Sequence, residues 1–307
     1  MIVIDALLLL LTFALGAALS RVSLCAVAGM QQALEAGNYA GLQRLLLAAG
    51  SAGAILLLFA GVLPERVSLP FDTALRFGMV GGGLLLGVGA LINGGCYLGS
   101  VLYLGTGNMN FLFTLGGLAL AARVAEFRAV LHTGAAPGLR VVTGTTWYLG
   151  LALFSMVTLA TLGTARFKGR YRAVLAGLLA GVVYARHPGW SYSSVIETLV
   201  AGPGEASDWR ANLAALMLFA GALAGAWLAG RFRWQPPTFM GGVRRFAGGT
   251  IMGLGAALVP GGNDTLLLWA IPGLTIYGVL AYGSMLVAIG AGLALGARFG
   301  GATRLPP

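Results

Sequence analysis

The sequence predicts an all-α integral membrane protein: a polytopic helical bundle of two internal repeats, whose broken or re-entrant helices meet at a central constriction. Three observations support this prediction. The 307 residues are 58% hydrophobic and 9% charged, with a mean hydropathy of +0.87, whereas soluble domains carry about 25% charged residues. The apolar residues form long runs, and two runs end at matching Gly-Gly breaks. An ordinary water-soluble enzyme is thereby excluded.

Apolar runs follow one another along the chain. A full crossing needs about 20 mostly apolar residues, and runs shorter than about 17 are typical of half-helices and re-entrant segments. We therefore expect about nine or ten segments, some of them incomplete crossings. The first run lacks a basic leader and a cleavage pattern, so it is expected to remain as a membrane helix. The runs are residues 2–19, 40–63, 77–92, 109–122, 141–162, 173–185, 211–228, 246–259, 266–280 and 285–297.

Basic residues outnumber acidic ones by 19 to 9, which gives a formal net charge of +10. All but Lys168 are arginines, and many lie in connectors between apolar runs. By the positive-inside rule this pattern indicates cytoplasmic connectors, and it predicts a multi-pass protein in the lipid bilayer. No basic and aromatic platform stands outside the apolar runs, so nucleic-acid binding is not expected. The arginine clusters are Arg123 with Arg128, and residues 166–172, 231–245 and 298–304.

An internal repeat is visible in the sequence. Residues 81–99 and 248–266 match once one residue is inserted in the second copy, and residues 21–29 and 186–194 show a weaker similarity. We therefore predict two membrane repeats, residues 1–165 and 173–307, joined by the basic connector 166–172 within one membrane domain. Each repeat contributes two broken segments. Paired interrupted segments of this kind point to a substrate site near the bilayer midplane.

The breaks have the chemistry of an anion site. Each one exposes backbone N–H groups at the start of the next helical piece, where the helix dipole adds partial positive charge. Glycine removes the side chains that would hold a ligand away from the backbone. The alternative is that these glycines serve only close helix packing. The glycines at the two breaks are Gly94, Gly95, Gly261 and Gly262.

Polar side chains at the breaks complete the candidate site. Cys25 and Cys96 both lie at irregular segments, and a thiol donates a weak hydrogen bond while its soft sulfur suits another sulfur atom. Asn263 occupies the position that matches Cys96, and its amide can donate instead. Asp264 either caps the following helix or carries a coupled proton. The secondary candidates are Asn93, Asp264 and Ser193.

No set of residues points to catalysis or to a cofactor. Two cysteines are too few for a disulfide framework, and neither has histidines at metal spacing. The sequence has no phosphate-binding loop and no Ser/His/Asp arrangement. We therefore expect neither an enzyme nor an ATP-driven pump, and no metal or cofactor.

Three segments carry a resemblance to a known family. These are Asn93-Gly-Gly-Cys96 with the following residues 97–107, Cys25 in Arg-Val-Ser-Leu-Cys, and residues 260–264. Together they resemble the YeeE/YedE sulphur-transport family over nearly the whole chain. The resemblance implies an hourglass-shaped helical protein of the bacterial inner membrane that takes up thiosulfate, with cysteines passing the anion along by thiol hydrogen bonds. Cys25 and Cys96 match the first and the central cysteine of the family, and Asn263 stands near the place of the third.

The sequence leaves several alternatives open. The cargo could be another small anion, such as sulfite or a selenium analogue, in place of thiosulfate. Cys25 and Cys96 could instead form the persulfide or disulfide couple of a membrane sulfurtransferase or redox protein, or the chain could be a structural membrane subunit. The resemblance also suggests a cytoplasmic sulfur-carrier protein as a partner. The driving force, the relative orientation of the repeats and the oligomeric state stay open.

Overall fold

The computed structural model describes residues 2–70, 77–124, 139–140, 144–188, 190–201, 209–259 and 261–298, and these are almost all helical. Arg128, Pro260 and residues 299–304 lie outside the described residues. Two short strands, Leu69–Pro70 (β1) and Leu139–Arg140 (β2), form one antiparallel pair. The helices are α1 Ile2–Val22, α2 Ala26–Ala36, α3 Ala40–Val62, α4 Phe77–Asn93, α5 Tyr97–Gly105, η1 Met109–Phe111, α6 Leu112–Val124, α8 Thr145–Thr164, α9 Arg170–Arg186, α10 Tyr192–Ala201, α11 Trp209–Leu228, α12 Phe239–Leu258, α13 Asn263–Thr265, η3 Leu266–Ala270 and α14 Ile276–Arg298.

The helices form a multi-pass membrane protein, as predicted. Six stretches of the described chain are long and apolar enough to cross a membrane, and a seventh crossing results if the bent pair α12 and Asn263–Ala270 is one span. Two of the six, Ala6–Ala36 and Phe77–Gly105, contain a break within the crossing. The apolar runs outnumber these stretches partly because two runs, 109–122 and 173–185, lie in helices of fewer than 18 residues, Met109–Val124 and α9.

The four predicted breaks are present: α1 gives way to α2, α4 to α5, α9 to α10, and α12 to α13. Gly94 (φ 72°) and Gly261 (φ 103°) adopt left-handed conformations at two of them, and glycine does so without steric cost. The N–H groups of Gly94 and Gly95 donate to the carbonyls of Leu91 (3.1 Å) and Ala90 (3.0 Å). These bonds satisfy carbonyls at the end of α4.

Close contact between α4 and α12 places the first break inside the bundle. A β-carbon on Gly248 would lie 2.5 Å from the backbone nitrogen of Asn93, and one on Gly89 would lie 2.6 Å from that of Met252. Only glycine fits at such distances, as at other membrane helix crossings with small residues. The end of α4 is thus packed directly against the backbone of α12.

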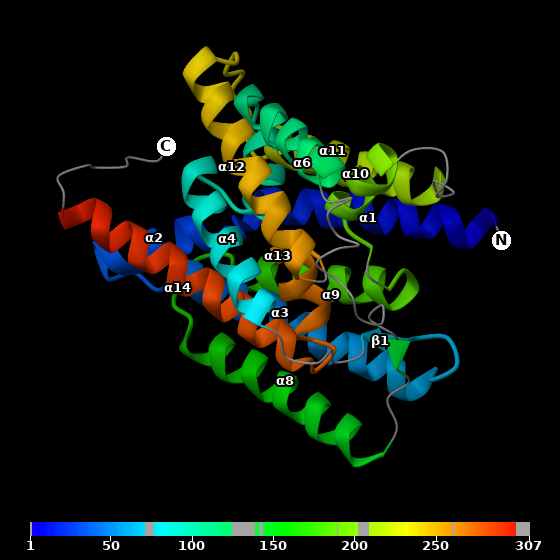
Figure 1. The fold of residues 1–307 in the computed structure, drawn as a ribbon. Coiled ribbons are helices and arrows are strands. Elements are labelled where there is room, and N and C mark those ends of the chain that lie inside the picture. Colours follow the sequence, from blue (N-terminus) through cyan, green and yellow to red (C-terminus); the bar gives the residue numbers. More distant parts are fainter. Residues whose placement is uncertain are drawn as a thin grey trace.

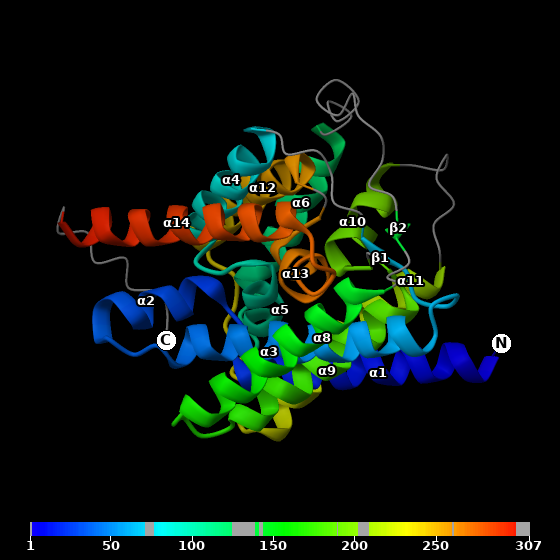
Figure 2. The same ribbon diagram turned by 90° about the horizontal axis from the view of Figure 1, so that it is seen from below.

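Four helix pairs make contacts that would match one another if the chain consisted of two related halves. Helix α1 packs on α11 and α3 packs on α9; α12 packs on α6 and α14 packs on α4. Figure 1 shows α12 crossing α4, with α8 at the edge of the molecule, and Figure 2 shows α5 and α13 close together near the middle. This pairing is the one that two related halves would produce. The internal repeat itself, with the boundaries 165/166 and 172/173, stays a prediction.

The structure corrects the sequence analysis in three places. The boundary between the runs 266–280 and 285–297 was predicted in the wrong place. The chain breaks after Ala270, and α14 runs unbroken from Ile276 to Arg298. Helix α12 begins at Phe239, ahead of the run that starts at residue 246, because Thr238 caps it by accepting the N–H of Gly241 (3.2 Å). A separate helix, α10, follows the third break, where no apolar run was expected.

Candidate functional site

The starts of four helices meet where the breaks converge. Cys25 is the N-cap residue of α2, Cys96 that of α5 and Gly262 that of α13, and Tyr192 begins α10. We call this convergence the central junction; it consists of Cys25, Cys96, Tyr97, Tyr192, Ser193, Gly262 and Asn263. The starts of α2, α5 and α10 add partial positive charge to this region. The junction therefore favours a negatively charged ligand.

The two cysteines lie side by side in this junction, on different helices. The Cys96 thiol donates to the Cys25 sulfur at 3.9 Å, and the backbone N–H of Ala26 donates to the Cys96 sulfur at 3.4 Å. Both cysteines are 1% exposed and free. Since a disulfide bond measures about 2.05 Å, this separation describes two neighbouring thiols. The structure thus brings together the two residues predicted to line one pathway.

Asn263 joins α13 to the start of α5. Its side-chain oxygen accepts the backbone N–H of Tyr97 at 2.9 Å, directly beyond Cys96 in the chain. Asn263 is 1% exposed, and among the described residues its side-chain nitrogen has no hydrogen-bond acceptor. A buried amide N–H₂ without an acceptor is costly. The arrangement leaves a donor at the junction for a ligand oxygen.

Ser193 and Gly262 lie on the other side of Tyr97. A β-carbon on Gly262 would lie 3.3 Å from the Ser193 hydroxyl and 3.3 Å from the Tyr97 ring. The Ser193 hydroxyl itself shares a 2.8 Å hydrogen bond with Ser191. The start of α10 therefore borders the junction, as the weaker repeat similarity around residues 186–194 indicated.

Two tyrosines belong to the site although the sequence analysis did not select them. The Tyr192 hydroxyl donates to the Tyr97 carbonyl at 2.9 Å, and their ring centroids are 6.0 Å apart. This bond ties the first turn of α10 to that of α5. The only signal in the sequence is their position directly after a break, which any buried aromatic residue can share.

Asn93 supports the first break through its side chain. Its amide nitrogen donates to the carbonyl of Gly95 (2.6 Å) and to the Ser100 hydroxyl (3.0 Å), and its oxygen accepts from the Thr114 hydroxyl (2.7 Å). Because these bonds use both ends of the amide, Asn93 positions the loop that carries Cys96.

The backbone N–H groups of Gly94 and Gly95 bond within the end of α4, as described above. The first N–H group of α5, that of Tyr97, bonds to Asn263. The capping expectation for Asp264 also changes: Gly262 is the N-cap residue and Asp264 lies in the first turn of α13, 4% exposed. An acidic residue there stabilises a helix start through the dipole.

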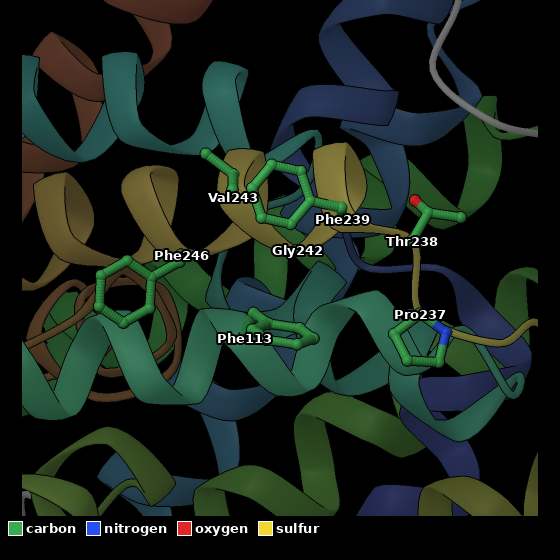
Figure 3. A pocket seen from close by; sticks show the side chains of 7 residues that line it. All are labelled: Phe113, Pro237, Thr238, Phe239, Gly242, Val243 and Phe246. Atoms are coloured by element: carbon green, nitrogen blue, oxygen red, sulfur yellow. The ribbon is translucent and has the colours of Figure 1, made fainter.

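A separate apolar pocket of about 340 Å³ lies between α6 and α12. Figure 3 shows its lining, with Phe113 on α6 facing Phe239, Val243 and Phe246 on α12. Thr238 is its only polar side chain, and that hydroxyl contacts Asn110 and the start of α12. The pocket therefore has none of the donors that an anion needs.

In the part of the chain that the structure describes, no three His, Cys, Asp or Glu residues group as metal ligands.

Comparisons with known proteins agree with this chemistry. A family model described as sulphur transport matches residues 139–293, about half of the chain, from β2 to near the end of α14. The match includes Ser193, Gly262 and Asn263, while both cysteines lie ahead of it. A search of curated proteins found no match.

Proposed function

Since this chain belongs to the YeeE/YedE sulphur-transport family, we propose that it takes up thiosulfate across the bacterial inner membrane through the central junction. The observation that carries the proposal is the convergence of four helix starts on two adjacent buried thiols and one amide N–H₂ without an acceptor. A small anion with both sulfur and oxygen atoms matches all three kinds of group. Transport of a sulfur compound also agrees with the helical membrane fold.

Each part of thiosulfate has a counterpart at the junction. Its double negative charge is favoured by the helix starts. Its terminal sulfur suits the thiols of Cys25 and Cys96, because soft atoms pair with soft atoms and a thiol donates a weak hydrogen bond. Its oxygens accept hydrogen bonds from the Asn263 amide. We propose that this amide replaces the third thiol of the family, because it donates to oxygen where a thiol would donate to sulfur.

The anion passes from one thiol to the other without a covalent bond. Cys25 and Cys96 are already in contact, so a thiosulfate sulfur held by one thiol is within reach of the other after a small movement. Several weak sites in series allow an ion to enter and leave, whereas a single tight site would retain it. On the cytoplasmic face, a sulfur-carrier protein would remove the anion and keep the flow inward.

Replacing Cys96 tests this proposal. In cells that lack their own sulfate and thiosulfate permeases, Cys96→Ala should lower the uptake of labelled thiosulfate by about tenfold or more, since one donor inside a dry pathway is lost. Cys96→Ser keeps a hydroxyl donor and should retain part of the uptake. Thr164→Ala removes an exposed hydroxyl from the peripheral helix α8 and serves as the control. Wild-type uptake by a well-inserted Cys96→Ala protein would contradict the relay.

The 3.9 Å contact between the thiols favours one rival function, a sulfurtransferase or redox couple. That function requires a covalent persulfide or disulfide during turnover. Intact-mass analysis of the protein after exposure to thiosulfate separates the two cases. An unchanged mass is expected for transport, and a mass increase of one sulfur atom would indicate the enzyme.

A further inference from the structure

A second group suited to anions lies beside the junction but outside it. Arg245 is on α12 and only 5% exposed. Two of its guanidinium nitrogens, Nε and one terminal nitrogen, are buried without a hydrogen-bond partner among the described residues. A guanidinium carries five N–H donors and keeps its charge at any physiological pH. A buried charge normally has a partner, so this one lacks its counter-ion.

The neighbouring arginine shows the contrast. The Nε of Arg244 donates to the carbonyl of Ile92 at 2.6 Å, and its NH2 group reaches the carbonyl of Leu91 at 3.5 Å. Arg244 thus satisfies the free carbonyls at the end of α4, a structural role. Arg245 makes no comparable bond in the described chain. Its guanidinium carbon lies 4.4 Å from the centre of the Phe111 ring, and such a cation–π contact offsets only part of the cost of burial.

Aromatic contacts connect Arg245 to the first break. The Phe111 ring that lies against the guanidinium also stacks on Tyr103, with ring centroids 4.8 Å apart. A β-carbon on Gly95 would lie 3.2 Å from the Tyr103 ring and 3.3 Å from the Phe111 ring. Gly95 directly precedes Cys96. The arginine is therefore separated from the loop of the thiol by these two rings.

The position of Arg245 along α12 places it on one side of the junction. Gly248 packs against Asn93 at the break, and Arg245 precedes it by about one helical turn. The chain ahead of α12 pairs with the turn after α5, where Arg233 and Gln235 donate from their backbones to the carbonyls of Thr106 and Gly107 (2.9 Å each). Arg245 thus lies between the break and the arginine-rich connector, which the positive-inside rule assigns to the cytoplasm.

We propose that Arg245 is an anion-binding residue on the exit side of the junction, and that its counter-ion is the transported sulfur oxyanion. This inference rests on the proposed transport function. The oxygens of such an anion match the fork of guanidinium N–H groups, which binds oxyanions in two-point contacts. The two nitrogens are closed off in this structure, so the anion reaches them when it moves past the Tyr103 and Phe111 rings.

Thermal unfolding of the purified protein tests the proposal without relying on transport. Sodium thiosulfate is titrated at constant ionic strength into wild-type protein and the variants Arg245→Gln, Arg245→Lys and Arg298→Gln. Arg298 is exposed at the end of α14, so its variant makes the same charge change away from the site. Thiosulfate should raise the melting temperature of the wild type and of Arg298→Gln with the same half-saturation. In Arg245→Gln the half-saturating concentration should rise by about tenfold or more.

Two further results separate binding from a structural role. Without thiosulfate, Arg245→Gln should melt no lower than the wild type, because it removes a buried charge that has no partner. Arg245→Lys keeps the charge without the fork and should show an intermediate half-saturation. An Arg245→Gln protein that melts lower but responds to thiosulfate like the wild type would overturn the proposal.

The outcome also distinguishes this inference from the proposed function. If cells expressing the wild type take up no thiosulfate, but sodium sulfite or sodium sulfate stabilises the purified protein through Arg245, then the cargo is wrong and the site stands. If none of the three anions stabilises the wild type, the site is overturned, whatever the uptake shows.

Discussion

At the scale of single residues, Asn263 has two separable roles. Its side-chain oxygen accepts the Tyr97 N–H and so holds α5 against α13, while its nitrogen stays without an acceptor in the described structure. The first role is structural and the second belongs to the ligand. A substitution that keeps the oxygen and removes the nitrogen therefore tests whether the amide N–H₂ donates to the transported anion.

Asn263→Asp makes this substitution. A carboxylate still accepts the Tyr97 N–H, but at neutral pH it repels a passing anion and lacks the amide donor. We expect uptake of labelled thiosulfate to fall by about tenfold or more, and the melting temperature to fall as well, because a carboxylate at a site that is 1% exposed loses its hydration. Asn263→Cys restores a thiol at this place and should retain uptake. Transport by Asn263→Asp at the wild-type rate would show that the amide does not face the pathway.

At the scale of elements, the crossing of α4 and α12 determines where the first break lies. The two helices approach so closely at Gly248 that an added β-carbon would lie 2.5 Å from the Asn93 nitrogen and 2.7 Å from its α-carbon. Asn93 in turn holds the carbonyl of Gly95. A change on α12 is thus transmitted through Asn93 to the loop that carries Cys96.

Gly248→Ala should therefore damage both stability and transport. The added methyl group forces the helices apart, which costs about 1–3 kcal/mol in a well-packed core. Circular-dichroism melting in detergent and thiosulfate uptake measure the two effects. Gly283→Ala on α14 is the matched control, because a β-carbon there meets nothing within 4 Å. If the two variants behave alike, the close crossing does not position the break.

At the scale of the whole molecule, the two ends of α3 allow the orientation that the positive-inside rule predicts to be tested. Arg44, near the start of α3, lies over the Phe167 ring at 5.1 Å, so the basic connector after α8 borders that end of α3. The other end of α3 leads to Glu65. A helix of 23 residues spans about 35 Å at 1.5 Å per residue, which is enough to separate two sides of a bilayer.

Labelling with a membrane-impermeant maleimide tests this orientation. Lys168→Cys should be protected in intact cells and labelled after lysis, because positive connectors stay in the cytoplasm. Glu65→Cys, at the opposite end of α3, should be labelled in intact cells. Cys25 and Cys96 are 1% exposed, so the unmodified protein provides the blank. The reverse pattern would place Arg245 on the entrance side of the junction.

Local features of the sequence were enough to predict the membrane class, the four breaks and the residues at their edges. Apolar run length, arginine placement and the repeated Gly-Gly pattern are local features, and a helix break depends on backbone conformations that glycine favours within a few residues. Cys25, Cys96 and Asn263 could be selected because each lies next to such a break. Run length was less informative near residues 266–298, where periodicity does not show which stretch bends.

Which groups meet depends on how the helices pack against one another. The Cys25–Cys96 contact, the bond from Tyr97 to Asn263 and the bond from Tyr192 to Tyr97 join residues that are from 71 to 166 positions apart. Their proximity follows from helix crossings that composition does not encode. The same holds for Arg245: in the sequence it is one of several arginines near a connector. The structure shows it buried without a partner, because the packing of α12 against α4 and α6 carries it into the bundle.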